Sequence, residues 1–170
     1  PKRIAWIQCV GSRDATCGRG YCSAVCCMYA TKEAIMAREH DADVEATIFH
    51  NDVRAYGKGF DAYYEQAQSK HNVRYVRSLI SSIRELQRTK NLLLRFLNDD
   101  GTVSEEQFDM VVLSVGMGPS AEAQDTGKRL DVDLTPYGFA ETSKFAPNES
   151  SRPGVYVCGD AAGVENGAVS

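Results

Sequence analysis

The sequence predicts an α/β fold: a nucleotide-binding-type domain with a parallel central sheet and an antiparallel meander, followed by part of a second domain. Apolar strand patterns alternate with helical patterns through the first half of the chain, which is typical of a parallel sheet. Asp100-Gly101 then separates two apolar runs, which indicates a hairpin. The chain has 170 residues, 43% of them hydrophobic and 25% charged, as in an ordinary globular protein.

The first five elements are expected to alternate between strand and helix. The first run is rich in β-formers and ends at Gly11, and the segment after Gly20 carries strong helix formers without Gly or Pro. Strand, helix, strand, helix and strand are expected at residues 3–10, 21–39, 44–50, 59–70 and 73–77. This order is that of a Rossmann-like domain.

A meander and a returning strand are expected next. The meander strands lie at residues 83–88 and 91–97, and the central strand at 107–115 runs into Gly116. The composition shifts beyond Ser120, so we divide the chain into domains at 1–119 and 120–170. In the second domain, residues 154–160 are expected to form a short strand, followed by the start of a helix.

Five of the six cysteines lie within 19 residues near the start of the chain, at Cys9, Cys17, Cys22, Cys26 and Cys27. In a chain without an export signal, such a group is more typical of a metal or redox centre than of disulfides. An iron–sulfur cluster needs about four thiolates, which Cys9, Cys22, Cys26 and Cys27 would supply, leaving Cys17 spare. Adjacent cysteines are unlike the usual zinc spacing, but zinc and redox or structural thiols remain alternatives.

The cysteines occupy the place of a glycine-rich phosphate loop. Gly11 is the one glycine close to the end of the first strand, so we do not expect pyridine nucleotide binding at this loop. Cys22 and Cys26 are four residues apart and would share a face of the predicted helix. Cys9, at the strand end, would point to the helix N-terminus, whose dipole favours thiolates.

Charge and hydropathy exclude some partners. A net charge of -4 argues against nucleic acid, which requires concentrated Lys and Arg. No apolar run approaches the ~20 residues that span a bilayer, so no direct membrane insertion is expected. With no leader in view, we expect a cytoplasmic location. The chain starts inside a strand-like pattern at Pro1-Lys2-Arg3, so we expect a piece of a longer protein.

Two segments resemble the thioredoxin-reductase-like flavoproteins. Residues 154–160, Gly-Val-Tyr-Val-Cys-Gly-Asp, resemble the late FAD-binding motif, and residues 112–119 resemble the crossover to the flavin domain. The resemblance implies that residues 1–119 are an NAD(P)-binding-like domain and 120–170 the incomplete C-terminal part of an FAD-binding domain. It implies FAD contacts at Gly116, Gly118, Gly159, Asp160 and Ala161.

The cysteine segment itself carries a narrower resemblance. Residues 7–13, Ile-Gln-Cys-Val-Gly-Ser-Arg, and residues 21–30, Tyr-Cys-Ser-Ala-Val-Cys-Cys-Met-Tyr-Ala, resemble the A subunit of heterodisulfide reductase. They also resemble the related subunit of the quinone-interacting membrane-bound oxidoreductase. The resemblance implies an oxidoreductase in which FAD and a [4Fe–4S] cluster pass electrons between partner subunits. The implied cluster ligands are Cys9, Cys22, Cys26 and Cys27, with Cys17 not carried over.

Two other functions stay open from the sequence. A pyridine-nucleotide-dependent flavoprotein disulfide reductase would use some of the cysteines as a redox pair. A zinc-stabilised interaction domain would use them structurally, without enzymatic activity. Both the disulfide reductase and the iron–sulfur oxidoreductase would be enzymes, and the 170 residues would form part of one. We expect these residues to be inactive alone.

Overall fold

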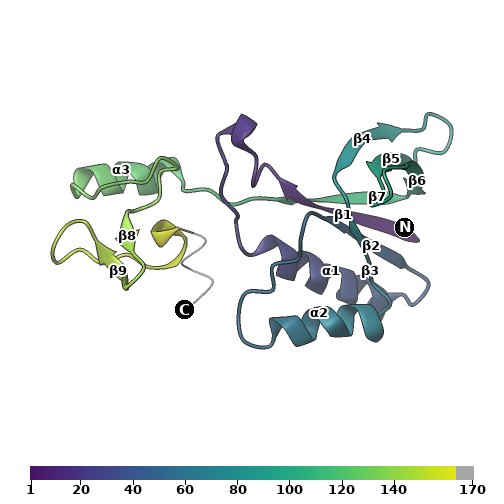
Figure 1. The fold of residues 1–170 in the computed structure, drawn as a ribbon, viewed down its shortest axis with the longest axis horizontal. Helices are drawn as coiled ribbons and strands as arrows, with labels where there is room; N and C mark the ends of the chain where they lie inside the picture. The colour runs from purple at the N-terminus through teal and green to yellow at the C-terminus, as the bar shows by residue number, and fades with distance from the viewer. Residues whose placement is uncertain (164–170) are drawn as a thin grey trace. The chain divides into compact units, whose positions relative to one another are not determined.

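The computed structural model describes residues 1–163 (Figure 1). The chain forms two compact units, one of residues 1–10 with 26–115 and the other of residues 11–25 with 116–170. No helix within the described residues combines the length and apolar content needed to cross a bilayer.

The first unit is built on a four-stranded parallel sheet with the strand order β3-β2-β1-β7. Its strands are β1 (Arg3–Val10), β2 (Glu45–His50), β3 (Arg74–Arg77) and β7 (Met110–Val115). Strand β1 pairs in parallel with β2 on one side and with β7 on the other. Residues 4–7 of β1 are buried, as expected for a strand covered on both faces. The predicted α/β fold with a parallel sheet is confirmed.

Helices α1 (Cys26–His40) and α2 (Phe60–Ser69) lie on one face of this sheet, as Figure 1 shows. Ile4 and Trp6 of β1 point to this face and pack with Ala30 and Ala34 of α1. Small alanines let the helix approach the sheet closely, and the indole N–H of Trp6 donates to Glu33 Oε2 over 2.9 Å. The alternation of β1 thus sends every second side chain into the helical layer.

The antiparallel meander covers the other face. Its strands are β4 (Ile80–Glu85), β5 (Leu92–Leu97) and β6 (Val103–Phe108), in the order β4-β5-β6. Ala5 and Ile7 of β1 pack on this side with Phe49, Phe96 and Phe108. Two strands of the predicted meander are confirmed, the first of them three residues earlier than expected, whereas residues 103–106 of its third strand, β6, were not predicted to form a strand.

The predicted strand over residues 107–115 is wrong, because the chain breaks at Asp109 into β6 and β7. The Asp109 carboxylate accepts hydrogen bonds from the backbone N–H groups of Lys2 and Arg3, at 2.6 and 2.9 Å. Its own N–H donates to the Arg3 carbonyl. Asp109 therefore binds the start of β1, while β6 belongs to the meander and β7 to the parallel sheet.

The predicted helix over residues 21–39 is wrong at its beginning, since α1 begins at Cys26. Ala24 has a left-handed φ of 60°, which a helix does not allow. The N–H of Ser23 donates to Ser12 Oγ at 3.2 Å, a partner eleven residues away. A hydrogen bond to a distant side chain replaces the first turns of the expected helix.

The second unit holds a helix that the sequence did not predict, α3 (Ala121–Arg129). Ser120 caps it, with Oγ accepting from the N–H of Ala123 at 3.1 Å. The unit also has η1 (Ala15–Cys17), the hairpin of β8 (Thr142–Ser143) and β9 (Ala146–Ser150), and η2 (Gly159–Ala162).

The predicted strand over residues 154–160 is wrong in extent. A single β-bridge joins Tyr156 to Glu149 of β9, with backbone hydrogen bonds from Ser150 to Val155 and from Val157 to Asn148 on either side of it. The helix expected after it is a 3-10 turn, η2, up to Ala162. The part of that prediction beyond Gly163 lies outside the described residues.

Candidate functional site

The carboxyl edge of the parallel sheet in the first unit holds three of the four predicted cluster ligands. From β1 the chain goes through α1 to β2 on one side, whereas β7 pairs with β1 on the other, so the strand order reverses between β1 and β7. Open α/β sheets bind ligands at the carboxyl ends of the strands beside such a point. Cys9 lies at the end of β1, and Cys26 and Cys27 begin α1.

Cys9 sits in a distortion of β1. Its φ is 61°, in the left-handed region, and the register with β7 shifts between Ile7 and Val10. A bulge of this kind turns a side chain away from regular strand geometry and is frequent beside functional sites. A non-glycine residue in this conformation costs free energy, and such costs are retained mainly where a site requires the geometry.

Cys26 and Cys27 diverge toward different strand ends. Cys26 Sγ lies 3.8 Å from the carbonyl oxygen of Val115, the last residue of β7. Cys27 Sγ lies 3.8 Å from the carbonyl oxygen of Asp52, two residues after β2. Because β1 lies between β2 and β7, the two thiols lie on either side of the strand that ends near Cys9. The N-terminus of α1 favours negative charge on both sulfurs.

A polar group that the sequence did not reveal surrounds Cys26. The Tyr29 hydroxyl donates to the Val115 carbonyl at 3.1 Å, and burial raises the pKa of this hydroxyl, with Cys26 beside it acting in the same direction. Gln8 Nε2 donates to Ser114 Oγ at 3.0 Å, while Gln8 Oε1 is buried without a hydrogen-bond partner. Gln8 in an otherwise apolar strand was the sequence signal for this group.

A second polar group lies on the Cys27 side. Thr31 Oγ1 donates to the Cys27 carbonyl at 2.7 Å and lies 2.9 Å from the Tyr75 hydroxyl, whose pKa is raised by burial to about 12. The His50 ring meets the Tyr75 ring edge-on, and its Nδ1 is buried without a hydrogen-bond partner. Burial lowers the pKa of His50, and the charge of Asp52 opposes that shift.

The second unit carries the fourth predicted ligand, Cys22, in the loop of residues 11–25. Cys22 precedes α1, so the prediction that it shares a helix face with Cys26 is wrong. The Ser23 N–H donates to Ser12 and takes no part in a helix. Cys22 Sγ accepts a hydrogen bond from the Ala24 N–H at 3.3 Å. Cys17 is exposed in η1, where its thiol donates to the Asp14 carboxylate at 3.3 Å.

Buried hydroxyls hold this loop in place. Ser12 Oγ and Ser23 Oγ lie 3.1 Å apart, and Ser23 Oγ accepts from the N–H of Met117 at 2.9 Å. The Tyr21 hydroxyl donates to the Met117 carbonyl at 2.7 Å. Side-chain hydrogen bonds therefore attach the loop that carries Cys22 to Met117, in the segment that directly follows β7.

Two of the predicted FAD contacts have a packing role within the second unit. A Cβ on Gly116 would meet Ser12 Cβ and Ser23 Oγ, both at 2.7 Å, so only glycine fits against the loop. A Cβ on Gly118 would meet the Tyr21 hydroxyl at 3.1 Å. The contacts at Gly116 explain that glycine by packing alone, whereas the looser contact at Gly118 does not, and the role of both toward FAD stays a prediction.

The remaining predicted FAD contacts form one short segment. Gly159 has a φ of 63° and begins η2, and Asp160 follows it in the first turn with its side chain exposed. The Ala161 carbonyl accepts from the N–H of Ala140 at 2.8 Å. The segment therefore presents the Asp160 side chain in the first turn of η2, and the hydrogen bond between Ala140 and Ala161 joins this turn to the rest of the second unit.

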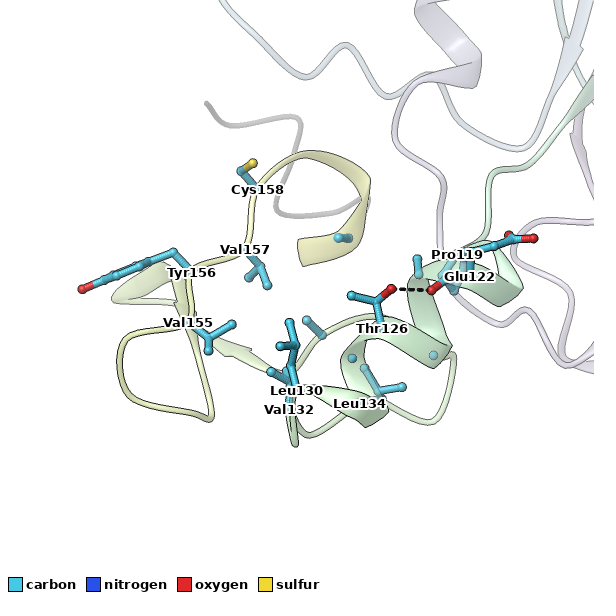
Figure 2. A pocket seen from close by; sticks show the side chains of 15 residues that line it. Pro119, Glu122, Thr126, Leu130, Val132, Leu134, Val155, Tyr156, Val157 and Cys158 are labelled. Atoms are coloured by element: carbon cyan, nitrogen blue, oxygen red, sulfur yellow. Dashed lines mark hydrogen bonds between the residues drawn. The ribbon is translucent and has the colours of Figure 1, made fainter.

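An apolar cavity of about 380 Å³ lies beside this segment in the second unit. Figure 2 shows Leu130, Val132 and Leu134 on one side and Val155 and Val157 on the other. The dashed line in the figure is the hydrogen bond from Thr126 Oγ1 to the Glu122 carbonyl. The cavity wall has few polar atoms, so it suits apolar side chains better than a phosphate.

The predicted ligand set has the chemistry of an iron–sulfur site. Four thiols form a soft donor set, which suits iron–sulfur clusters and zinc and not magnesium or calcium. The helix N-terminus at Cys26 and the N–H donor at Cys22 both favour sulfur atoms with negative charge. Within residues 1–163, no three Cys, His, Asp or Glu side chains converge into a closed ion site. The assignment of the four ligands therefore stays a prediction.

Comparisons with known proteins decide the family. A family model described as pyridine nucleotide-disulphide oxidoreductase matches residues 7–169. The chain belongs to this family. The fold agrees with that of thioredoxin reductase from Lactococcus lactis, with a TM-score of 0.58 over 98% of this chain and 49% of that one, at 19% identity.

This member of the pyridine nucleotide-disulphide oxidoreductase family is also similar to named parts of a larger enzyme. It is 40% identical over 167 residues to the iron-sulfur A subunit of CoB–CoM heterodisulfide reductase from Methanocaldococcus jannaschii. It is 42% identical over 166 residues to an A subunit of the same enzyme from Methanopyrus kandleri. Each match covers 96% of this chain and 25% of the relative, so the chain spans a quarter of the length of these proteins. The resemblance drawn from the cysteine segment is confirmed.

Proposed function

We propose that the chain is the electron-transfer portion of an FAD- and iron–sulfur-dependent oxidoreductase similar to the A subunit of heterodisulfide reductase. In this proposal Cys9, Cys22, Cys26 and Cys27 bind a [4Fe–4S] cluster. The observation that carries it is the placement of Cys9, Cys26 and Cys27 at the carboxyl edge of β1, β2 and β7, where the strand order reverses. When bound, FAD would supply two-electron chemistry and the cluster one-electron chemistry.

The chain's own residues would stabilise the ligand thiolates in each unit. The N-terminus of α1 offsets the charge of the Cys26 and Cys27 thiolates, and the bulge gives Cys9 a backbone conformation that differs from that of a regular strand. The Ala24 N–H donates to Cys22 Sγ, and hydrogen bonds of this kind stabilise a ligand thiolate. Cys17, exposed and bonded to Asp14, is left out of the set.

The flavin part of the proposal rests on the second unit. We propose that residues 1–119 are an NAD(P)-binding-like domain and that 120–170 contribute the C-terminal part of an FAD-binding domain. Asp160 is exposed at the start of η2, where a carboxylate can accept a hydrogen bond from a sugar hydroxyl of FAD, with Gly159 and Ala161 beside it. Since the relatives are about four times longer, other parts of such a protein would complete the flavin site.

We propose that the partners are other subunits of a redox complex in the cytoplasm. The names of the similar proteins support this, because they describe subunits of CoB–CoM heterodisulfide reductase and of an H(2):CoB-CoM heterodisulfide,ferredoxin reductase.

Anaerobic reconstitution of the chain with iron and sulfide tests the proposal. We expect about four iron and four sulfide per chain and a broad visible absorbance that bleaches on reduction. Cys26→Ala should lose most of the bound iron, because a thiolate ligand is missing. Cys17→Ala is the matched control and should keep it. Equal iron loss in both variants, or one zinc and no iron in the wild type, would contradict the proposal.

A second function is favoured by the family itself. A pyridine-nucleotide-dependent disulfide reductase would bind NAD(P)H at the carboxyl edge of the sheet. Titration of the chain with NADH and NADPH, followed by fluorescence, separates the two functions. We expect no saturable binding, since cysteines occupy the place of the phosphate loop and Gly11 is the one glycine close to the end of β1.

A further inference from the structure

A series of polar side chains runs from the interior of the first unit toward Cys26. Gln8 on β1 and Ser114 on the neighbouring strand β7 are 5% and 0% exposed, and they share a hydrogen bond. Gln8 Oε1 is buried with no hydrogen-bond partner. Burying Gln8 Oε1 without a hydrogen bond costs free energy, and two apolar side chains at these positions would hold the strands together without that cost. Packing alone therefore does not explain the polar pair.

Tyr29 joins this pair to the thiol. It lies three residues after Cys26 on α1, and side chains three apart lie on the same face of a helix. Cys26 raises the pKa of the Tyr29 hydroxyl and Ser114 lowers it, so both side chains lie near that hydroxyl. The Tyr29 hydroxyl and Cys26 Sγ also reach the same acceptor, the Val115 carbonyl, at 3.1 and 3.8 Å.

Cluster binding would remove one of the two donors to the Val115 carbonyl, the Cys26 thiol, and leave the Tyr29 hydroxyl. A ligand cysteine is a thiolate and has no proton to give to the Val115 carbonyl. The Tyr29 hydroxyl keeps its proton and can turn about its C–O bond, so it can donate to the Cys26 sulfur instead. Ser114, held by Gln8, directly precedes Val115 on β7 and lowers the pKa of the Tyr29 hydroxyl, so it lies beside that hydroxyl.

We propose that Tyr29 is a positioning residue that donates a hydrogen bond to the Cys26 sulfur and thereby raises the reduction potential of the cluster. Ser114 and Gln8 hold its hydroxyl for this role. The inference rests on the proposed function, because it requires Cys26 to be a cluster ligand. Reduction adds one electron, here from a chemical reductant, and so adds negative charge to the cluster and its sulfurs. A donor to a ligand sulfur stabilises the reduced state more than the oxidised state.

The test is a redox titration of the reconstituted chain, followed by its visible absorbance and by electron paramagnetic resonance. Tyr29→Phe should keep its iron and show a lower potential, with the reduction equilibrium shifted about tenfold, which is ~59 mV for one electron. Ser114→Ala should shift it in the same direction by less. Tyr63→Phe is the matched control, since Tyr63 packs on the same apolar cluster and the pKa of its hydroxyl is raised by burial and by Glu39.

Ser114→Ala covers the case in which Tyr29→Phe binds iron poorly, because it removes a neighbour of the Tyr29 hydroxyl and leaves the hydroxyl and every cysteine in place. Full iron in Ser114→Ala with the wild-type potential, or full iron in all variants with equal potentials, overturns the inference and leaves the proposed function standing. A wild-type chain that takes up no iron overturns both.

Discussion

The two units support their cysteines in different ways. In the first unit, Cys9, Cys26 and Cys27 lie at the ends of β1 and α1, which two buried apolar clusters hold in place. In the second unit, the loop with Cys22 is held by the buried hydroxyls of Ser12 and Ser23 and by Tyr21, whose ring contacts those of Tyr137 and Phe139. The comparison teaches that apolar packing places three of the proposed ligands, whereas directional hydrogen bonds contribute to placing the fourth. Packing and hydrogen bonding should therefore fail under different substitutions.

The largest expected effect is in the apolar clusters of the first unit. Phe49 is 1% exposed and contacts the rings of Phe96 and Phe108, so Phe49→Ala should lower the free energy of unfolding by about 3–5 kcal/mol. Urea unfolding followed by circular dichroism measures it. Phe145→Ala, at a fully exposed phenylalanine of the second unit, is the control and should change it by less than about 0.5 kcal/mol. Similar losses in both variants would show that the apolar clusters do not distinguish the units.

An intermediate effect is expected where Gly116 meets the loop. Gly116→Ala places a Cβ 2.7 Å from Ser12 Cβ and Ser23 Oγ and should cost about 1–3 kcal/mol of unfolding free energy. Iron uptake should fall as well, because the loop carries Cys22. Gly118→Ala is the matched control with a smaller expected cost, since its new Cβ meets only the ends of flexible side chains. Thermal unfolding and the iron content after reconstitution should be measured for both variants. A Gly116→Ala variant with the stability and iron content of the wild type would contradict the prediction.

The smallest expected effect concerns His50 at the end of β2. Burial lowers the pKa of His50 in the folded chain below its ordinary value of 6.5. As the pH falls, His50 therefore binds a proton at a higher pH in the unfolded chain than in the folded chain. Stability from this residue is therefore full above about pH 6.5 and is lost as the pH falls below that value. His50→Gln should make the urea midpoint fall less between about pH 8 and pH 5.5 than in the wild type. Parallel pH curves for the two proteins would exclude the effect.

Local patterns were sufficient for much of the fold. The alternation of strand and helix up to residue 77 and the hairpin at Asp100-Gly101 follow from periodicity and turn chemistry, which short segments express by themselves. The break at Asp109 does not, because its partners, the N–H groups of Lys2 and Arg3, lie more than 100 residues away. The start of α1 likewise depends on Ser12, which lies outside the helix.

The candidate site divides in the same way. By itself the sequence determined that cysteines replace a phosphate loop after the first strand, since residue types and their spacing are local facts. Only the tertiary structure decided that Cys26 and Cys27 approach different strand ends and that Cys22 lies in a loop before the helix. It also joined Gln8 to Ser114 and brought Tyr29 and Cys26 to the same acceptor, the Val115 carbonyl. The physical reason is that these contacts join β1, α1 and β7, whose register is set by burial on both faces of the sheet.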